Sequence, residues 1–209
     1  MTARRHDRVM RAVDVLAAAG LLLLTAPVTA GVALAVRWRL GSPVLFRQVR
    51  AGRNAQPFTI HKFRTMLHEV APDGRLRTEE ERLTPLGAFL RRTSLDELPQ
   101  LVDVLRGSMA LVGPRPLYLD YLPLYTPVRA RRLEVRPGIT GLAQVSGRNE
   151  LPWDQRLALD VQYVDSRSVL LDLRILVLTA RRVVSGSGVT QTGHATNEMF
   201  TGSHDHAGR

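Results

Sequence analysis

Cysteine is absent from this chain of 209 residues, and lysine is nearly absent. Without cysteine, the protein can form neither disulfides nor thiolate metal sites, and it has no cysteine nucleophile. Lys62 is the only lysine, so arginine carries almost all of the positive charge. Aromatic residues make up only 5% of the sequence, which disfavours a nucleic-acid surface built on base stacking.

Positive charge, in contrast, is abundant. The formal net charge is +10 and the isoelectric point is about 11.3. Such a balance suits an anionic partner, which can be a nucleic acid, a phosphorylated substrate or an acidic lipid. Composition by itself does not choose among these three.

A long apolar segment near the N-terminus, Ala12 to Val36, contains Asp14 as its only charged residue. As a helix it would be roughly 37 Å long, enough to cross a hydrocarbon core of about 30 Å. A signal peptide fits poorly because the segment is too long. Pro27, in the middle, removes a backbone hydrogen bond and predicts a bend there.

Both flanks of this segment are basic. The arginines are Arg4, Arg5, Arg8 and Arg11 before it, and Arg37, Arg39, Arg47, Arg50 and Arg53 after it. Because positive flanks stay in the cytoplasm, a bent helix that enters and leaves the same leaflet satisfies both of them. The sequence therefore favours a re-entrant membrane helix, and a kinked spanning helix is the alternative.

The remaining chain alternates short segments with turns, and we expect a mainly α fold with short β segments (α+β). We divide the chain into a basic N-terminus and membrane helix (1–40), a compact cytosolic and interfacial domain (41–185) and a polar tail (186–209). Residue preferences and turn signals predict strands or extended loops at Pro43–Gln48 and Pro57–Phe63, and a strand at Leu142–Val145. Helical spacing predicts helices at Leu83–Arg92, Leu95–Arg106, Trp153–Val164 and Val169–Val184. The last helix is unusually apolar and suits either the core or the membrane interface.

The stretch Arg91 to Gln100 contains the residues with the clearest chemical potential. Ser94 and Glu97 fit a capping box at the start of a helix, and Asp96 would lie in its first turn. Pro99 just beyond predicts an irregular helix start. As an alternative to a purely structural role, the Asp96 carboxylate can attack phosphorus and form an acyl phosphate.

An anionic nucleophile needs cations, because a diphosphate substrate repels it. Arg91 stands just upstream, and Arg115 lies between two prolines that fix the backbone around it. Mg²⁺ is the natural metal here, since it binds one or two carboxylates together with substrate phosphates. Glycines around Gly138 would allow a backbone to approach a ligand closely, and Arg148 would then contact a base or a phosphate.

Four strings of residues resemble, in order and spacing, the motifs of the bacterial sugar transferases. Within that family they are similar to the small monotopic polyprenyl-phosphate phosphoglycosyl transferases. The strings are Lys62–Met66, Ser94–Leu98, Val112–Leu117, and Arg136–Gly141 with Gly147–Asn149. The resemblance extends over nearly the whole chain, including the N-terminal segment.

The resemblance implies a two-step reaction at the cytoplasmic face of the bacterial inner membrane. Asp96 would attack the β-phosphorus of a UDP-sugar, release UMP and carry the phospho-sugar covalently, with Mg²⁺ bound near it. Undecaprenyl phosphate would then take the phospho-sugar in the first membrane step of glycoconjugate or exopolysaccharide synthesis. Glu97 would assist, either by activating the lipid phosphate or by ordering the metal. The implied substrate-binding residues are Lys62, Arg91, Arg115 and Arg148.

The expected partners are therefore a UDP-sugar, polyprenyl phosphate and membrane lipid, but no nucleic acid. A second copy of the chain, as a homodimer, is a further candidate. Two other classes compete with the enzyme. A non-catalytic, membrane-anchored protein could dock its basic face on acidic lipid. A nucleic-acid-binding protein is suggested by charge alone, and it would leave the apolar segment unexplained.

Overall fold

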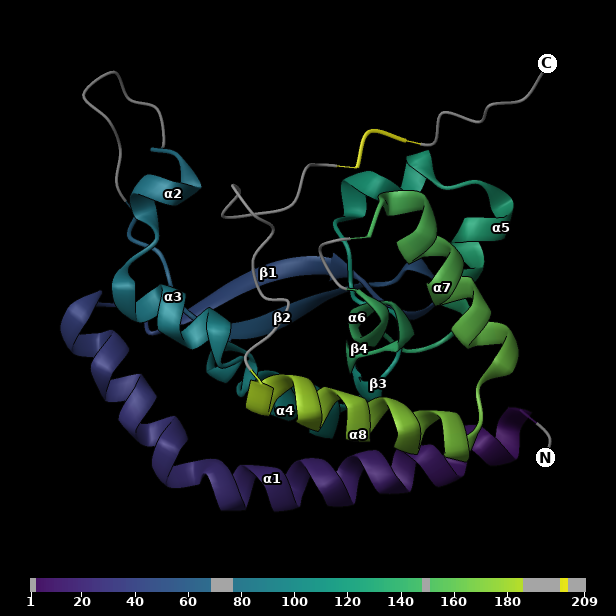
Figure 1. The fold of residues 1–209 in the computed structure, drawn as a ribbon, viewed down its shortest axis with the longest axis horizontal. Helices are drawn as coiled ribbons and strands as arrows, with labels where there is room; N and C mark the ends of the chain where they lie inside the picture. Colours follow the sequence, from purple (N-terminus) through teal and green to yellow (C-terminus); the bar gives the residue numbers. More distant parts are fainter. Residues whose placement is uncertain (1–2, 69–76, 148–150, 186–199, 203–209) are drawn as a thin grey trace.

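The structure, a computed structural model, describes residues 3–68, 77–147, 151–185 and 200–202. It is mostly helical, with two small two-stranded sheets and one long apolar helix at the N-terminus (Figure 1). This confirms the predicted mixture of helices and short strands. The division of the chain into three parts stays a prediction.

Helix α1 (Ala3–Arg39) includes the apolar segment and is long and apolar enough to cross a membrane. Figure 1 shows that it runs along one side of the molecule and bends. Pro27 lies inside the helix, and a proline within a helix is the usual cause of such a bend. The Thr25 hydroxyl donates to the Leu21 carbonyl at 2.7 Å, which adds a polar contact one turn before the bend.

The N-terminal arm of α1 packs against α4 (Gln100–Arg106). Ala18 lies in the main core with Leu101. Arg11 donates to the carbonyls of Val104 and Leu105 at 2.6 and 2.8 Å. Because these carbonyls end a helix, a cation there also meets the negative end of the helix dipole.

The C-terminal arm of α1 packs on the same body through a second core. Val36 is buried there together with Phe63 and Leu90. Leu90 belongs to α3 (Pro85–Arg92), which follows the short α2 (Glu79–Arg82). Both arms of the bent helix therefore rest on one folded unit.

An antiparallel hairpin of β1 (Leu45–Ala51) and β2 (Pro57–Phe63) lies beneath the site described below. Its register runs from Leu45 opposite Phe63 to Ala51 opposite Pro57, and η1 (Arg53–Ala55) lies within its turn. The two predicted strands thus exist. Strand β2 contacts both η2 (Leu95–Glu97) and α4, so it carries side chains to the start of that helical segment.

The second sheet pairs β3 (Ala110–Val112) with β4 (Gly138–Thr140) in parallel. A Cβ on Gly138 would lie 2.1 Å from the backbone nitrogen of Gly113. These glycines therefore allow two backbones to pack together, which is a structural use rather than the expected approach to a ligand. The strand predicted at Leu142–Val145 is wrong: α6 (Leu142–Ser146) forms there, directly after β4.

Short helices and two longer ones complete the fold. They are η3 (Leu119–Leu124), α5 (Pro127–Ala130), η4 (Arg131–Glu134), α7 (Trp153–Ser166) and α8 (Val169–Ser185). Helix α8 contributes Ile175 to the main core. Phe200, in the segment we had predicted to be a polar tail, is instead buried against Tyr121 and Trp153.

Candidate active site

Asp96 lies in the single turn η2, not in a regular helix. Ser94 has a left-handed backbone (φ 57°) and makes no side-chain capping bond, so the predicted capping box is wrong. Helix α4 begins only after Pro99, which stands at its N-cap. The predicted irregularity at Pro99 is confirmed, and it leaves the Glu97 side chain available for other contacts.

Glu97 forms ion pairs with two cations from different parts of the chain. Its Oε1 accepts from Lys62 Nζ at 2.6 Å and from Arg115 Nη2 at 3.0 Å. Lys62 projects from β2, and Arg115 comes from the loop after β3. Three of the residues predicted for the site are thus in direct contact, although they are far apart in sequence.

The Asp96 side chain lies beside this trio and is 7% exposed. Burial raises the pKa of Asp96 to about 6, and repulsion from Glu97 adds to the increase. Lys62, Arg91 and Arg115 act in the opposite direction and lower that pKa. The carboxylate is therefore largely ionised at neutral pH, in a poorly solvated position surrounded by positive charge.

No described residue donates a hydrogen bond to the Asp96 carboxylate, which sets it apart from the other buried aspartates. In the parts of the chain that the structure describes, Asp14, Asp103, Asp160 and Asp172 are also buried. Their donors are the Leu111 backbone N–H, His61, Arg132 and Tyr163, respectively. A carboxylate that has no donor among the described residues and has cations around it is a candidate for binding a ligand or reacting with one.

Arg91 is held at the edge of the site by Thr65. Its Nε donates to the Thr65 hydroxyl at 3.1 Å, and Thr65 is itself buried. The guanidinium lowers the pKa of Asp96 from this position. Arg91 is among the site residues predicted from the sequence, whereas Thr65 is not, although Thr65 lies in the same string as Lys62.

A buried ion pair, Arg132 with Asp160, supports Arg115 from behind. Arg132 Nη2 lies 2.7 Å from Asp160 Oδ2 and 2.6 Å from the Arg115 carbonyl oxygen. The pair thereby fixes the backbone from which Arg115 reaches Glu97. The sequence does not predict this buried pair, because nothing in it distinguishes Arg132 from the adjacent Arg131. The ion pair of Arg131 with Asp165 is exposed.

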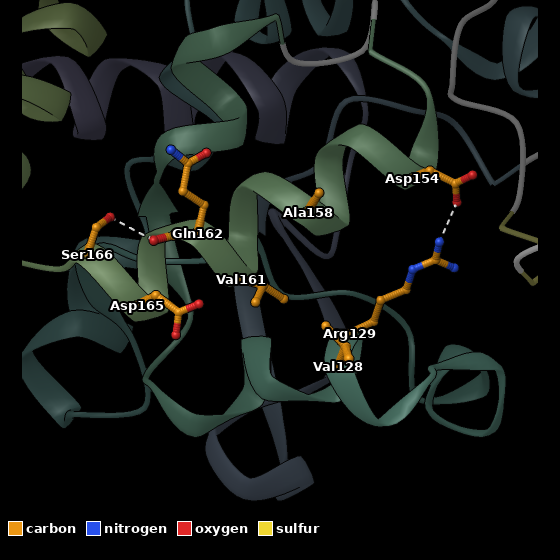
Figure 2. Close-up of a pocket in the computed structure, with 8 residues that line it drawn as sticks. All are labelled: Val128, Arg129, Asp154, Ala158, Val161, Gln162, Asp165 and Ser166. Atoms are coloured by element: carbon orange, nitrogen blue, oxygen red, sulfur yellow. Dashed lines mark hydrogen bonds and ion pairs between the residues drawn. The ribbon is translucent and has the colours of Figure 1, made fainter.

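Arg148, the remaining predicted substrate-binding residue, lies outside the described residues. A surface hollow of about 480 Å³ lies between α5 and α7 (Figure 2). None of the predicted site residues lines it. Its walls include Val128, Val161 and the ion pair of Arg129 with Asp154. This hollow is therefore separate from the candidate site around Asp96.

The donor set at Asp96 fits a Mg²⁺ ion that is shared with a substrate. The described residues contain no cluster of three or more acidic or histidine side chains able to cage a metal. Asp96 and Glu97 supply carboxylates in an otherwise cationic site. Mg²⁺ is commonly held by one or two carboxylates, with phosphate oxygens and waters completing its shell.

Comparison with known proteins agrees with the motifs. The family model described as "Bacterial sugar transferase" matches residues 5–186. The "Uncharacterized sugar transferase EpsL" of Bacillus subtilis (strain 168) is 52% identical over 195 residues, covering 93% of this chain and 96% of the relative.

Two other relatives carry more specific names. The "UDP-glucose:undecaprenyl-phosphate glucose-1-phosphate transferase" of Caulobacter vibrioides is 44% identical over 81% of this chain and 67% of its own length. The "Undecaprenyl-phosphate galactose phosphotransferase" of Salmonella typhimurium is 37% identical over 89% of this chain, which spans only 43% of that relative. The protein therefore belongs to the bacterial sugar transferase family, as its four strings of residues predicted.

Proposed function

We propose that this protein transfers a sugar 1-phosphate from a UDP-sugar to undecaprenyl phosphate through a covalent intermediate on Asp96. The general reaction is the one for which relatives from Caulobacter vibrioides and Salmonella typhimurium are named. The observation that carries the covalent step is the buried Asp96 carboxylate, which accepts no hydrogen bond from the described residues and is surrounded by Lys62, Arg91 and Arg115.

In the first step, a carboxylate oxygen of Asp96 attacks the β-phosphorus of the donor. A bond forms between that oxygen and phosphorus, the bond from phosphorus to the bridging oxygen breaks, and UMP leaves. In the second step, an oxygen of the lipid phosphate attacks the same phosphorus and displaces the Asp96 carboxylate. The product is a polyprenyl diphosphate sugar, and Asp96 is regenerated.

The cations around Asp96 make the first step feasible. Lys62 and Arg115 contact Glu97, and Arg91, held by Thr65, is close enough to lower the pKa of Asp96. Bound Mg²⁺, held by Asp96 with substrate oxygens, would neutralise charge on the diphosphate. Glu97 positions Lys62 and Arg115 through its ion pairs. Arg148 is assigned to the nucleotide end of the donor on resemblance alone.

A re-entrant placement of α1 is supported by its contacts. Arg11 near its start and Val36 near its end both pack against the folded unit that carries Asp96. A straight spanning helix would separate these ends by the thickness of the bilayer. Between them lie large exposed apolar side chains, among them Leu16, Leu23 and Leu24, which suit a lipid environment.

Helix α8 is proposed to lie at the membrane interface. Leu170, Leu173 and Val177 are exposed on it, at positions three and four residues apart that share one helix face. Its other face contributes Ile175 to the core shared with α1. An interfacial site brings a cytosolic donor and a lipid acceptor to the same carboxylate, at the cytoplasmic face of the inner membrane.

The direct test is transfer of radiolabel from a panel of UDP-sugars to undecaprenyl phosphate, with Mg²⁺ present. We expect label in the lipid fraction and stoichiometric release of UMP for one or a few sugars, and neither product with Asp96→Asn. Binding to acidic vesicles without any transfer would instead indicate a non-catalytic membrane protein.

Topology is tested separately, with single cysteines introduced into this cysteine-free chain. In intact cells, Ala3→Cys and Arg47→Cys are both expected to resist a thiol reagent that cannot cross the membrane, and both should react after lysis. Labelling of only one of them in intact cells would mean that α1 spans the bilayer.

A further inference from the structure

We infer that Arg50, stacked on Tyr118, binds the α-phosphate of the donor, the phosphate that leaves with the nucleoside as UMP. The inference rests on the proposed function, because it assigns a second position along the same diphosphate. It adds a binding residue and its aromatic support to the group around Asp96.

The guanidinium of Arg50 packs on the aromatic ring of Tyr118. The carbon of its guanidinium lies 3.6 Å from the centroid of the Tyr118 ring, within the range of a strong cation–π contact. The next residue, Ala51, donates its backbone N–H to the Leu117 carbonyl at 3.0 Å. The end of β1 is thereby fixed to the segment that joins Arg115 to Tyr118.

The charge of Arg50 is not balanced by a carboxylate in the described part of the chain. Its Nη2 donates to the neutral Gln48 side chain at 2.5 Å, while its Nε is buried without a hydrogen-bond partner. Burial lowers the pKa of Arg50, and the nearby Arg115 lowers it further. A half-buried guanidinium with an unused donor next to a second guanidinium is an arrangement that an anion would stabilise.

A chain of contacts connects Arg50 to Asp96 through Arg115. Arg115 Nη2 donates to Glu97, the residue next to Asp96, at 3.0 Å. Two residues beyond Arg115, the Leu117 carbonyl accepts from the backbone N–H of Ala51, which follows Arg50. A diphosphate whose β-phosphorus faces Asp96 would therefore extend past Arg115 and present its α-phosphate towards Arg50.

The aromatic surface beneath Arg50 is itself supported. Tyr121 packs edge-to-face on Tyr118 with ring centroids 5.5 Å apart, and Phe200 packs in the same way on Tyr121, also at 5.5 Å. The Phe200 backbone N–H donates to the Tyr121 hydroxyl at 3.2 Å. The C-terminal segment thus stabilises the ring on which Arg50 rests.

The test measures equilibrium binding of UMP and of uridine by titration calorimetry, with the full-length protein in detergent micelles. Arg50→Gln is expected to raise the dissociation constant of UMP at least tenfold and to change that of uridine less than twofold, since uridine lacks the phosphate. Arg47→Gln is the matched control, because Arg47 lies on the opposite face of the same strand. It should change UMP binding less than twofold.

A second variant helps to distinguish loss of the phosphate contact from misfolding. Tyr118→Leu retains Arg50 but removes the ring beneath it, and it should weaken UMP binding by a smaller factor than Arg50→Gln does. Unchanged UMP binding in Arg50→Gln would overturn the inference, and so would an equal loss for uridine and UMP. A rise in KM for the lipid acceptor alone would also overturn it. The proposed function fails on a different result, which is the absence of UMP release by the wild type from every UDP-sugar.

Discussion

Asp96 and Asp172 are both buried aspartates whose pKa is raised to about 6, chiefly by burial. Asp172, on α8, accepts a hydrogen bond of 2.7 Å from the Tyr163 hydroxyl of α7, so it joins two helices. Asp96 accepts none from the described residues and faces three cations. A raised pKa therefore does not distinguish a catalytic carboxylate from a structural one. The hydrogen-bond partner and the surrounding charge do.

The largest expected effect is on turnover. Asp96→Asn removes the nucleophile and should lower UMP release by more than about a thousandfold, in line with losses seen when a covalent catalyst is removed. Asp172→Asn should stay within about threefold of the wild type, because the hydrogen bond of Asp172 to Tyr163 joins α7 and α8 and involves no predicted site residue. Initial rates of UMP release under saturating donor measure both variants. Comparable losses of UMP release in the two variants would contradict the assignment of Asp96 as catalytic and Asp172 as structural.

The second expected effect is on stability, and it has opposite signs for Asp96→Asn and for Tyr163→Phe, which removes a donor from Asp172. An aspartate whose folded pKa exceeds its unfolded value of 3.8 destabilises the fold progressively as pH rises from about 4 to about 6. Asp96→Asn should therefore raise the free energy of unfolding at pH 8 by about 1 to 3 kcal/mol, and the gain should vanish below pH 4.

Tyr163→Phe is the counterpart at the structural position. It removes the Tyr163 hydroxyl that donates to the buried Asp172 carboxylate at 2.7 Å, which should lower stability by about 1 to 3 kcal/mol. Thermal and denaturant unfolding at pH 8 would measure both variants. If Asp96→Asn destabilised the protein as Tyr163→Phe does, Asp96 would be a structural residue with an unidentified partner.

The smallest expected effect is a shift in the pH profile of the first step. Adduct formation should increase with pH as Asp96 ionises, with a midpoint below about 6 because Mg²⁺ held by Asp96 would lower its pKa further. Glu97→Gln removes a repulsion that raises the pKa of Asp96, so the midpoint should move lower. Lys62→Met removes an attraction and should move it higher. The ratio of rates at pH 5 and pH 8 reports the shift even where absolute rates fall, and shifts of the same sign would contradict the assigned electrostatics.

Sequence patterns located both strands of the hairpin, though not their pairing, because both are short, rich in β-prone residues and bounded by turn formers. The first strand begins at Leu45, two residues later than predicted. The patterns failed at Leu142–Val145, where a brief apolar run suits a strand or a helix equally and tertiary packing selects α6. They also failed at Ser94. The Glu97 side chain can either complete a capping box with Ser94 or form ion pairs with Lys62 and Arg115. The ion pairs form because the fold brings Lys62 and Arg115 close to Glu97, which local sequence does not predict.

Contacts between residues far apart in sequence account for the rest of what was missed. Nothing near Arg132 predicts its pairing with Asp160, and nothing in the polar C-terminal sequence predicts that Phe200 packs against Tyr121. The same limit applies to Arg50. As one arginine in a basic flank it favours a membrane surface, whereas its contact with Tyr118 suggests a phosphate site.

The most direct test of the central claim is mass spectrometry of the protein quenched in acid shortly after mixing with donor and Mg²⁺ in the absence of lipid acceptor. Trypsin would release the peptide from Thr93 to Arg106, which contains Asp96. The account predicts that this peptide gains the mass of a sugar phosphate at Asp96, and that the gain disappears when undecaprenyl phosphate is added. UMP release with this peptide unmodified at every quench time would contradict a covalent intermediate on Asp96.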